Sequence, residues 1–396
     1  MAAVDTARSE PSRGFFLNDP VVRGVIYQIV TAVLVVGFAI WIIGNTAGNL
    51  AAQNKTTGFD FLWRTAGFDI SFSLLPWSRS SYYWEAFLVG ITNTLLVAFI
   101  GIVLATILGF TLGIARLSSN FIISRLATIY IETIRNIPLL LQLFFWYFAV
   151  LKAMPAVRES IALPFDMFIN QRGIFVPRPI VDEQFGFVWI GVALAIAAVV
   201  VMRTWAKRRL EQTGKRFPVF LASVGLLLAI VAVTWLVSGA SMVFEPPVLE
   251  RFNFKGGLQL PPEFVALLFG LTIYTGAFIA ETVRGGIQAV SKGQTEAAQS
   301  LGIREGDRLR LVIIPQAMRV IVPPLTSQYL NLTKNSSLGA AIGYPELVNV
   351  FAGTSLNQTG RAIECIALTM LVYLTFSLLT SLIMNWYNAR VKLVER

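Results

Sequence analysis

Long apolar runs alternate with short charged segments along almost the whole chain. A helix of about 20 apolar residues is long enough to cross the hydrocarbon core of a bilayer. Eight runs reach or approach this length, and we predict one spanning helix for each. They lie at residues 24–44, 87–115, 133–152, 185–202, 217–238, 264–282, 319–343 and 366–388. The pattern therefore predicts an all-α integral membrane protein with about eight spans.

The composition agrees with a location in the bilayer. Of the 396 residues, 55% are hydrophobic and only 14% are charged, whereas a soluble domain carries about 25% charged residues. The first apolar run is too long for a signal peptide and no small-residue cleavage site follows it, so we expect it to be retained. Residues 45–85 form an external loop rich in aromatic side chains, which we interpret as a belt at the membrane interface.

The lysine and arginine residues indicate how the chain is oriented. If the N-terminus is cytoplasmic, the cytoplasmic segments hold most of the 32 basic residues, as the positive-inside rule requires. An even number of spans then places both termini in the cytoplasm. The formal net charge of +10 is explained by this topology, and no nucleic-acid partner is needed. The basic turn at 203–216 is most simply a topological anchor, and a site for anionic lipid is the alternative.

The residue types that are missing exclude several kinds of chemistry. The chain has one cysteine, Cys365, and no histidine. An intramolecular disulfide is therefore impossible, as are Cys/His metal sites and histidine-based catalysis. We predict no metal site, no cofactor and no catalytic residue. The chain also has no ATP-binding motif of its own.

A patterned polar segment, residues 284–318, separates the sixth and seventh predicted spans. Just before it, Glu281 and Arg284 are spaced i, i+3 and can pair on one helix face. Ser291 and Gln294 form a plausible capping box for a short helix at 294–301. This segment is the most informative stretch in the sequence.

The end of that short helix has the properties of a coupling element. Gly302 can adopt the left-handed conformation that ends a helix, and it allows a sharp turn between two rigid helices. Ala297 and Ala298 give a slim surface that can enter a groove on another protein. Pro315 precedes the next span and can set a kink. Charged residues that would fix the orientation surround the alanines: Glu296, Arg304, Asp307 and Arg308.

These residues resemble the EAA loop of ATP-binding-cassette (ABC) importer permeases, with EAA at 296–298, then Gly302, then an apolar-x-apolar-Pro ending. Val312 and Ile314 depart from the family's preferred Ile and Leu but keep size and apolarity. Three stretches resemble the polar amino acid permeases of the histidine and glutamine type: ETIRNIPLLLQLFF (132–145), AFIAETVRGGI (277–287) and PPLTSQYLNLTKNSSLGAAIGYPELV (323–348). With its extra spans, the chain is most similar to the enlarged general L-amino acid permeases.

The resemblance implies an architecture. Residues 86–152 and 263–396 would form a type I ABC importer permease core, with the coupling loop at 284–318. Residues 1–85 would hold the cytoplasmic N-terminus, an extra first span and an external loop. Residues 153–262 would form an insertion of external loops and a helical hairpin. The implied location is the bacterial inner membrane, and the implied partners are an ATPase dimer, a second related permease and an external (periplasmic) amino acid binding protein.

Residues 326–337 are unusually polar for a membrane span, because nine of the twelve are polar. A lysine at the centre of a bilayer costs about 2.5 kcal/mol or more. Such a segment should face protein or a wet cavity. Gln328, Asn331 and Asn335 fall on one helix face, and Pro323 with Pro324 would bend or break the helix before them.

We interpret this segment as part of a substrate pathway. Lys334 could meet an α-carboxylate, and Glu346 could meet an α-ammonium near the outer end. The alternative is that these groups join one span to its neighbour, with Lys334 ion-paired or snorkelling and Glu346 exposed in a loop. The candidate pathway residues are Gln328, Asn331, Lys334, Ser337 and Glu346.

Two other functions stay open at this stage. An autonomous ion-coupled secondary transporter or channel for small polar solutes would need its own ion site, but Glu132 and Glu281 lie near span ends. A membrane enzyme would need an activated nucleophile or clustered acids, which the sequence lacks. We therefore expect a permease subunit of an ATP-driven amino acid importer, which forms half of a translocation pathway.

Overall fold

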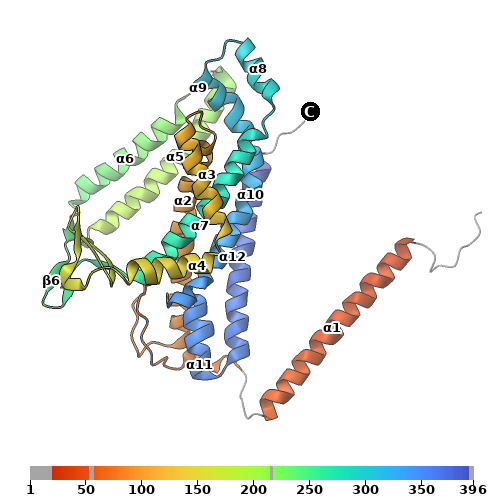
Figure 1. The fold of residues 1–396 in the computed structure, drawn as a ribbon, viewed down its shortest axis with the longest axis vertical. Helices are drawn as coiled ribbons and strands as arrows, with labels where there is room; N and C mark the ends of the chain where they lie inside the picture. The colour runs from red at the N-terminus through yellow and green to blue at the C-terminus, as the bar shows by residue number, and fades with distance from the viewer. Residues whose placement is uncertain (1–19, 53–57, 215–216, 392–396) are drawn as a thin grey trace, which may run out of the picture.

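The computed structural model describes residues 20–52, 58–214 and 217–391. Helices α2, α7, α10 and α12 run side by side in an elongated bundle, with α8 and α9 at one end and α11 at the other (Figure 1). Among the described residues, seven helices are long and apolar enough to cross a membrane, or eight if one bent pair counts as a span. The prediction of a helical membrane protein with about eight spans is therefore confirmed.

Short 3-10 and π-helical segments precede or continue several of the α-helices. The α-helices are α1 (Pro20–Ala52), α2 (Tyr83–Arg116), α3 (Phe121–Asn136), α4 (Leu139–Phe144), α5 (Phe185–Thr213), α6 (Val219–Ser238), α7 (Pro262–Gln288), α8 (Lys292–Ser300), α9 (Glu305–Arg308), α10 (Ile314–Asn335), α11 (Leu356–Thr359) and α12 (Ala362–Val391). The 3-10 segments are η2 (Asp60–Trp63), η4 (Val157–Glu159) and η6 (Ser336–Ile342), and the π-helical segments are η3 (Phe145–Leu151), η5 (Leu309–Ile313) and η7 (Val348–Ser355).

The predicted third span, residues 133–152, is wrong as a single straight helix. The chain bends by 105° between α3 and the segment formed by α4 and η3. Pro138 lies at this break as the N-cap of α4, where its ring and its missing N–H end the preceding helix. The side-chain amide of Gln142 donates to the carbonyls of Ile134 and Ile137, at 2.9 Å each. It thereby satisfies backbone groups that the break leaves without helical partners.

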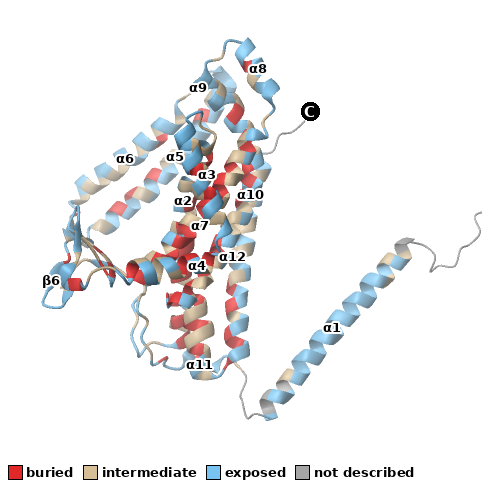
Figure 2. Ribbon diagram, viewed as in Figure 1, coloured by how far each residue is buried: buried red, intermediate tan, exposed pale blue. Residues whose placement is uncertain are grey.

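Helices α2, α7 and α10 form the centre of the bundle, where buried residues concentrate (Figure 2). A Cβ atom at Gly109 of α2 would lie 2.4 Å from Cγ2 of Ile279 in α7, and one at Gly113 would lie 2.7 Å from the carbonyl oxygen of Ala280. Only glycine allows these two helices to approach so closely. The sequence pattern Gly-x-x-x-Gly in α2 therefore marks a packing contact.

The two segments predicted as external loops, 153–183 and 239–262, contain short β-strands. Three small sheets form, with strand orders β1-β2-β3-β8, β4-β5 and β6-β7. Strands β3 and β8 pair across the two segments, as do β4 and β5, so the segments form one folded unit, which we call the β-module. The strands are β1 (Ile161–Leu163), β2 (Met167–Asn170), β3 (Gly173–Val176), β4 (Arg178–Val181), β5 (Met242–Glu245), β6 (Val248–Glu250), β7 (Asn253–Lys255) and β8 (Leu258–Leu260).

The inserted helical hairpin consists of α5 and α6, which pack against each other. A Cβ atom at Gly191 would lie 2.2 Å from Oγ1 of Thr234, so the glycine permits close contact. Gly214 and Gly239 end the two helices in the left-handed conformation, with φ of 66° each. The predicted short fourth span thus continues to Thr213, well past residue 202.

The β-module is connected to the hairpin through Asp182. The Asp182 carboxylate accepts hydrogen bonds from the backbone N–H of Ser241 at 2.8 Å and of Phe185 at 3.0 Å. These bonds, led by the one from Ser241, hold the pKa of Asp182 below its ordinary value. One carboxylate therefore joins the start of α5 to the segment after α6.

The extra first span and the predicted external loop differ in how they contact the bundle. No described residue of α1 is buried, and the helix lies apart from the bundle (Figures 1 and 2). The external loop, in contrast, packs on the bundle. Phe61 is only 1% exposed and contacts the rings of Tyr83 and Phe351, and Arg361 pairs with Asp60 at 3.0 Å. The interpretation of the loop as an interfacial belt is therefore wrong for Phe61.

Candidate coupling loop and translocation pathway

The short helix of the predicted coupling loop is present as α8, slightly earlier in the chain than expected. Ser291 is its N-cap, but the Ser291 side chain makes no capping hydrogen bond, so the predicted capping box does not form. Gln294 instead accepts a hydrogen bond from the side-chain amide of Gln316 at 3.1 Å. This bond connects α8 to the first turns of α10.

Gly302 ends α8 as predicted, in the left-handed conformation with φ of +69°. Its N–H donates to the carbonyl of Gln299 at 2.9 Å, and the N–H of Ile303 donates to that of Ala298 at 3.1 Å. Both bonds satisfy carbonyls at the helix end. A β-carbon at Gly302 would meet no atom within 4 Å, so backbone conformation and not space is what favours glycine here.

The two alanines of the EAA sequence have different roles. Ala297 is exposed, whereas Ala298 is 3% exposed and packs inside the loop. The prediction that both present a surface to a partner is wrong for Ala298. Among the charged residues, Glu296, Arg304 and Asp307 are exposed. Arg308 is half-buried and donates to Glu305 at 3.2 Å, so its side chain stabilises the loop itself.

Beyond Gly302 the chain runs as one continuous helical rod from Glu305 to Ile342. Pro315 lies in the first turn of α10 and directly follows the π-helical segment η5, where a missing N–H is tolerated. Pro323 and Pro324 lie inside α10, and the predicted break of the helix before the polar segment does not occur. Both prolines are exposed, so their rings do not disturb the core.

A cluster of charged residues, which we call the Arg116 clamp, joins three helices just below the coupling loop. Arg116 at the end of α2 donates to Glu281 of α7 at 2.7 Å and to Glu132 of α3 at 2.8 Å. Glu281 also pairs with Arg284, as the i, i+3 spacing predicts. The spacing of Glu281 and Arg284 predicts their pairing, but no local pattern indicates Arg116, because its partners lie 16 and 165 residues away.

The polar residues of α10 line two separate cavities. The first, which we call the α7 cavity, has a volume of about 300 Å³ and is closed on its other side by Tyr274, Thr275 and Phe278 of α7. Its α10 side is formed by Gln328, Asn331 and Asn335. The prediction that these three side chains share one helix face is therefore confirmed.

Lys334 lies on a different side of α10, and Ser337 follows in η6. They line the second cavity, which we call the α12 cavity, with a volume of about 480 Å³. The remaining lining residues are Val348, Thr369, Met370, Tyr373, Leu374 and Ser377. The five candidate pathway residues therefore do not form one group.

Glu346 belongs to neither cavity. It is 0% exposed, and so it is not the loop carboxylate at the outer surface that the sequence suggested. Its oxygens accept from the backbone N–H groups of Val348 at 2.8 Å and Asn349 at 2.7 Å, and from the Tyr373 hydroxyl at 3.0 Å. These bonds cap the start of η7. We therefore assign Glu346 a structural role and leave it out of the pathway.

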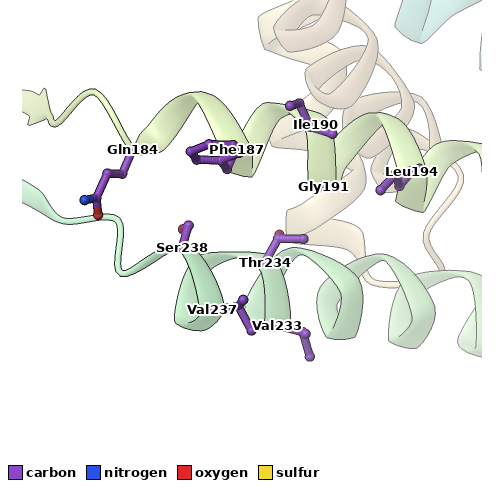
Figure 3. A pocket seen from close by; sticks show the side chains of 9 residues that line it. All are labelled: Gln184, Phe187, Ile190, Gly191, Leu194, Val233, Thr234, Val237 and Ser238. Carbon is purple, nitrogen blue, oxygen red and sulfur yellow. The ribbon is translucent and has the colours of Figure 1, made fainter.

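A third cavity, of about 550 Å³, opens between α5 and α6 (Figure 3). Its lining is mostly apolar, with Phe187 and Leu194 on α5 and Val233 on α6. Thr234 and Ser238 already donate to carbonyls of their own helix. Because this cavity lies in the hairpin and away from α7 and α10, it carries no part of the candidate pathway.

Comparison with known proteins decides the family. Residues 204–393 match the model of the binding-protein-dependent transport system inner membrane component. Over 382 residues, covering 96% of this chain and 95% of the relative, the sequence is 51% identical to the general L-amino acid transport system permease protein AapQ of Rhizobium johnstonii. The chain belongs to the family of amino acid ABC transporter permeases. The resemblance stated from the EAA loop and the three flanking stretches is confirmed.

Two further relatives differ in how much of this permease they cover. The permease is 42% identical, over 98% of its length and 99% of the relative's, to the glutamate/glutamine/aspartate/asparagine transport system permease protein BztB of Rhodobacter capsulatus. The probable glutamine ABC transporter permease protein GlnM of Bacillus subtilis is 34% identical over 195 residues, which are 49% of this permease and 82% of GlnM. Most of the shorter relative thus aligns with half of this permease.

Proposed function

We propose that this permease forms half of the translocation pathway of an ATP-driven amino acid importer in a bacterial inner membrane. The observation that carries the proposal is the α7 cavity. Its volume of about 300 Å³ is at the lower end of the range for small-molecule sites. Amide and hydroxyl side chains line it, although the two helices otherwise pack through apolar residues. These polar side chains are Tyr274, Thr275, Gln328, Asn331 and Asn335.

The lining supports a polar amino acid as the substrate. Amide groups both donate and accept hydrogen bonds, so Gln328, Asn331 and Asn335 can bind an α-ammonium and an α-carboxylate alike. No charged side chain lines this cavity, so the cavity does not discriminate between acidic and neutral side chains by charge. The names of AapQ and BztB, which describe broad or mixed amino acid transport, support the same substrate class.

A second, related permease subunit would complete the pathway. Ser327, Asn331 and Lys334 are all exposed on the spanning part of α10, and their spacing of four and three residues places them along one stripe. A polar stripe facing lipid is unfavourable. The stripe therefore supports contact with another protein subunit or with a water-filled path between two subunits.

The exposed surface of the coupling loop would bind an ATPase dimer in the cytoplasm. Glu296, Ala297, Arg304 and Asp307 lie around the turn at Gly302 and are accessible. Both termini would then be cytoplasmic, and an external binding protein would deliver the amino acid to the opposite end of the bundle. ATP hydrolysis would belong to the partner subunits, and this permease would contribute no catalytic residue.

The geometry supports an alternating-access mechanism. Movement of the ATPase dimer would displace the coupling loop, and the loop is connected to α10 through the turn at Gly302 and the Gln294–Gln316 hydrogen bond. A shift of α10 against α7 would change the access to the α7 cavity, because the two helices form its opposite walls. The Arg116 clamp would hold the end of α7 against α2 and α3 during this movement.

The test compares Gly302→Asp with Gly306→Asp in vesicles that contain the permease, its partner permease, the ATPase and the binding protein. Both substitutions add the same side chain to a position where a Cβ meets no atom within 4 Å. Only Gly302 has a positive φ, so only that substitution strains the loop. We expect ATP-dependent amino acid uptake to be abolished by Gly302→Asp and retained with Gly306→Asp, while both complexes assemble.

Uptake that continues without ATP would contradict the importer proposal and favour an ion-coupled transporter or a channel. Equal uptake by the two variants would show that transport does not depend on the backbone conformation at Gly302.

A further inference from the structure

Lys334 is a charged residue in a spanning helix for which the structure shows no counter-charge. It is exposed toward the α12 cavity. In the part of the chain that the structure describes, no carboxylate forms an ion pair with its ammonium group. An unpaired ammonium group is costly at membrane depth. An anion from outside the described chain would neutralise Lys334.

The α12 cavity offers a second group that is free to bind a ligand. The hydroxyls of Ser337 and Thr369 donate to carbonyls of their own helices, at 2.7 and 2.8 Å, and that of Tyr373 donates to Glu346. Ser377 lines the same cavity, and among the described residues its hydroxyl has no hydrogen-bond partner. Lys334 and Ser377 can therefore both donate to one anion.

The α12 cavity is separate from the α7 cavity. The two share no lining residue, and they face different neighbours of α10. Gln328 and Lys334 are six positions apart, so on a helix with about 3.6 residues per turn their side chains point in clearly different directions. A ligand in the α12 cavity would occupy a site of its own.

The depth of the α12 cavity limits which anions can reach it. Tyr373 lies eleven residues from the start of the span Ala362–Ala389 and sixteen from its end, or about 16 and 24 Å along the helix axis. A lipid headgroup at the membrane surface is far from this depth. One ammonium group and one hydroxyl also suit a singly charged anion better than a phosphate.

We propose that the α12 cavity is a second polar site of the permease and binds a carboxylate, with the Lys334 ammonium supplying the charge and Ser377 a hydrogen bond. Two sources present this group. One is the α-carboxylate of an amino acid in transit, and in that case the inference rests on the proposed function. The other is an Asp or Glu side chain of the second permease subunit.

The experiment uses Ser377→Cys in the assembled complex. The only native cysteine, Cys365, is 0% exposed and gives little background labelling. While no partner carboxylate neutralises Lys334, we expect an anionic methanethiosulfonate to react about thirtyfold faster than a cationic one of similar size, because the attraction of one and the repulsion of the other each amount to about 1 kcal/mol for unit charges about 4 Å apart in water. The preference should disappear with Lys334→Met and persist with Lys334→Arg. Gln328→Cys in the α7 cavity is the matched control, because Gln328 is partly exposed, and its labelling should not depend on Lys334.

Protection from labelling distinguishes the two sources. If the amino acid supplies the carboxylate, L-glutamine and L-glutamate should slow the labelling of Ser377→Cys, and L-glutaminamide, which lacks the α-carboxylate, should not. If the partner subunit supplies it, labelling should be slow in the complex without any amino acid and fast in the separated permease. Either pattern supports the site.

The site is ruled out if, in the complex and in the separated permease alike, the two reagents react at equal rates whether or not Lys334 is present. It is equally ruled out if Ser377→Cys reacts with neither reagent in any form of the protein. Neither readout requires uptake or ATP, so the failure of this inference is distinguishable from the failure of the proposed function.

Discussion

At the scale of single residues, position on the helix decides which polar groups can act on a ligand. Gln328 and Lys334 belong to the same polar run, yet they line different cavities. Glu346 is buried and fully hydrogen-bonded. The polar character of residues 326–337 was visible in the sequence. Which neighbouring helix each polar side chain faces was not, because that depends on the helices that lie on each side of α10.

Gln328→Leu should raise the concentration of amino acid needed for half-maximal uptake by about tenfold, because one or two hydrogen bonds to the substrate, worth about 1 kcal/mol each, are lost. Uptake kinetics in vesicles measure this change. Gln212→Leu, the same substitution at an exposed position of α5, is the control. Unchanged kinetics for Gln328→Leu would remove the α7 cavity from the pathway.

At the scale of helices, close packing and breaks follow from a few residue types. Glycine at 109 and 113 brings α2 against α7. Pro138 breaks the third span, and Gln142 satisfies the carbonyls that the break releases. Prolines 323 and 324 are equally visible in the sequence, yet α10 continues through them. Proline alone therefore does not predict a break; its neighbours in the fold decide.

Gly109→Ala should lower the stability of the permease by about 1–3 kcal/mol, the usual cost of overpacking, because the new methyl group would lie 2.4 Å from Ile279. The midpoint of thermal unfolding in nanodiscs measures this effect. Gly225→Ala in α6, where a Cβ meets no atom within 4 Å, should have no comparable effect. Equal midpoints for the two variants would show that α2 and α7 can separate freely.

At the scale of the whole molecule, the two predicted parts of the permease core are held together by packing and by charge. Helices α2 and α3 come from residues 86–152, whereas α7 comes from 263–396. The Arg116 clamp joins these parts near the predicted coupling loop with ion pairs of 2.7 and 2.8 Å. Arg116 is only 18% exposed, so solvent screens the ion pairs less than it would at an open surface.

Arg116→Met should lower the stability by about 1–3 kcal/mol, because Glu132 and a half-buried Glu281 lose charged hydrogen bonds. Adding Glu281→Gln should cost less than the sum of the two single changes, since the pair is already broken. Thermal unfolding of the four proteins in this cycle measures the coupling. Arg125→Met is the control, because Arg125 stacks on Phe121 of its own helix. Strict additivity would show that the clamp contributes nothing.

Most of the helical framework was predictable from the sequence, because seven spans are long apolar runs that need no knowledge of their neighbours. The left-handed Gly302 was predictable for the same local reason. The β-module was not, since its strands are only three or four residues long and their pairing joins segments about 80 residues apart. The Arg116 clamp likewise depends on Glu281, which is 165 residues away in the sequence.

The continuous helix from Glu305 to Ile342 has a consequence for the size of the movements involved. Asp307 at the loop and Gln328 at the α7 cavity are 21 residues apart on this rod, or about 31 Å. If the rod pivots near Gln328, a displacement of about 5 Å at the loop corresponds to a tilt of only about 10°. The rod would then be a lever with its long arm between the cavity and the loop. A large displacement of the loop would become a small rotation of the side chains that line the cavity.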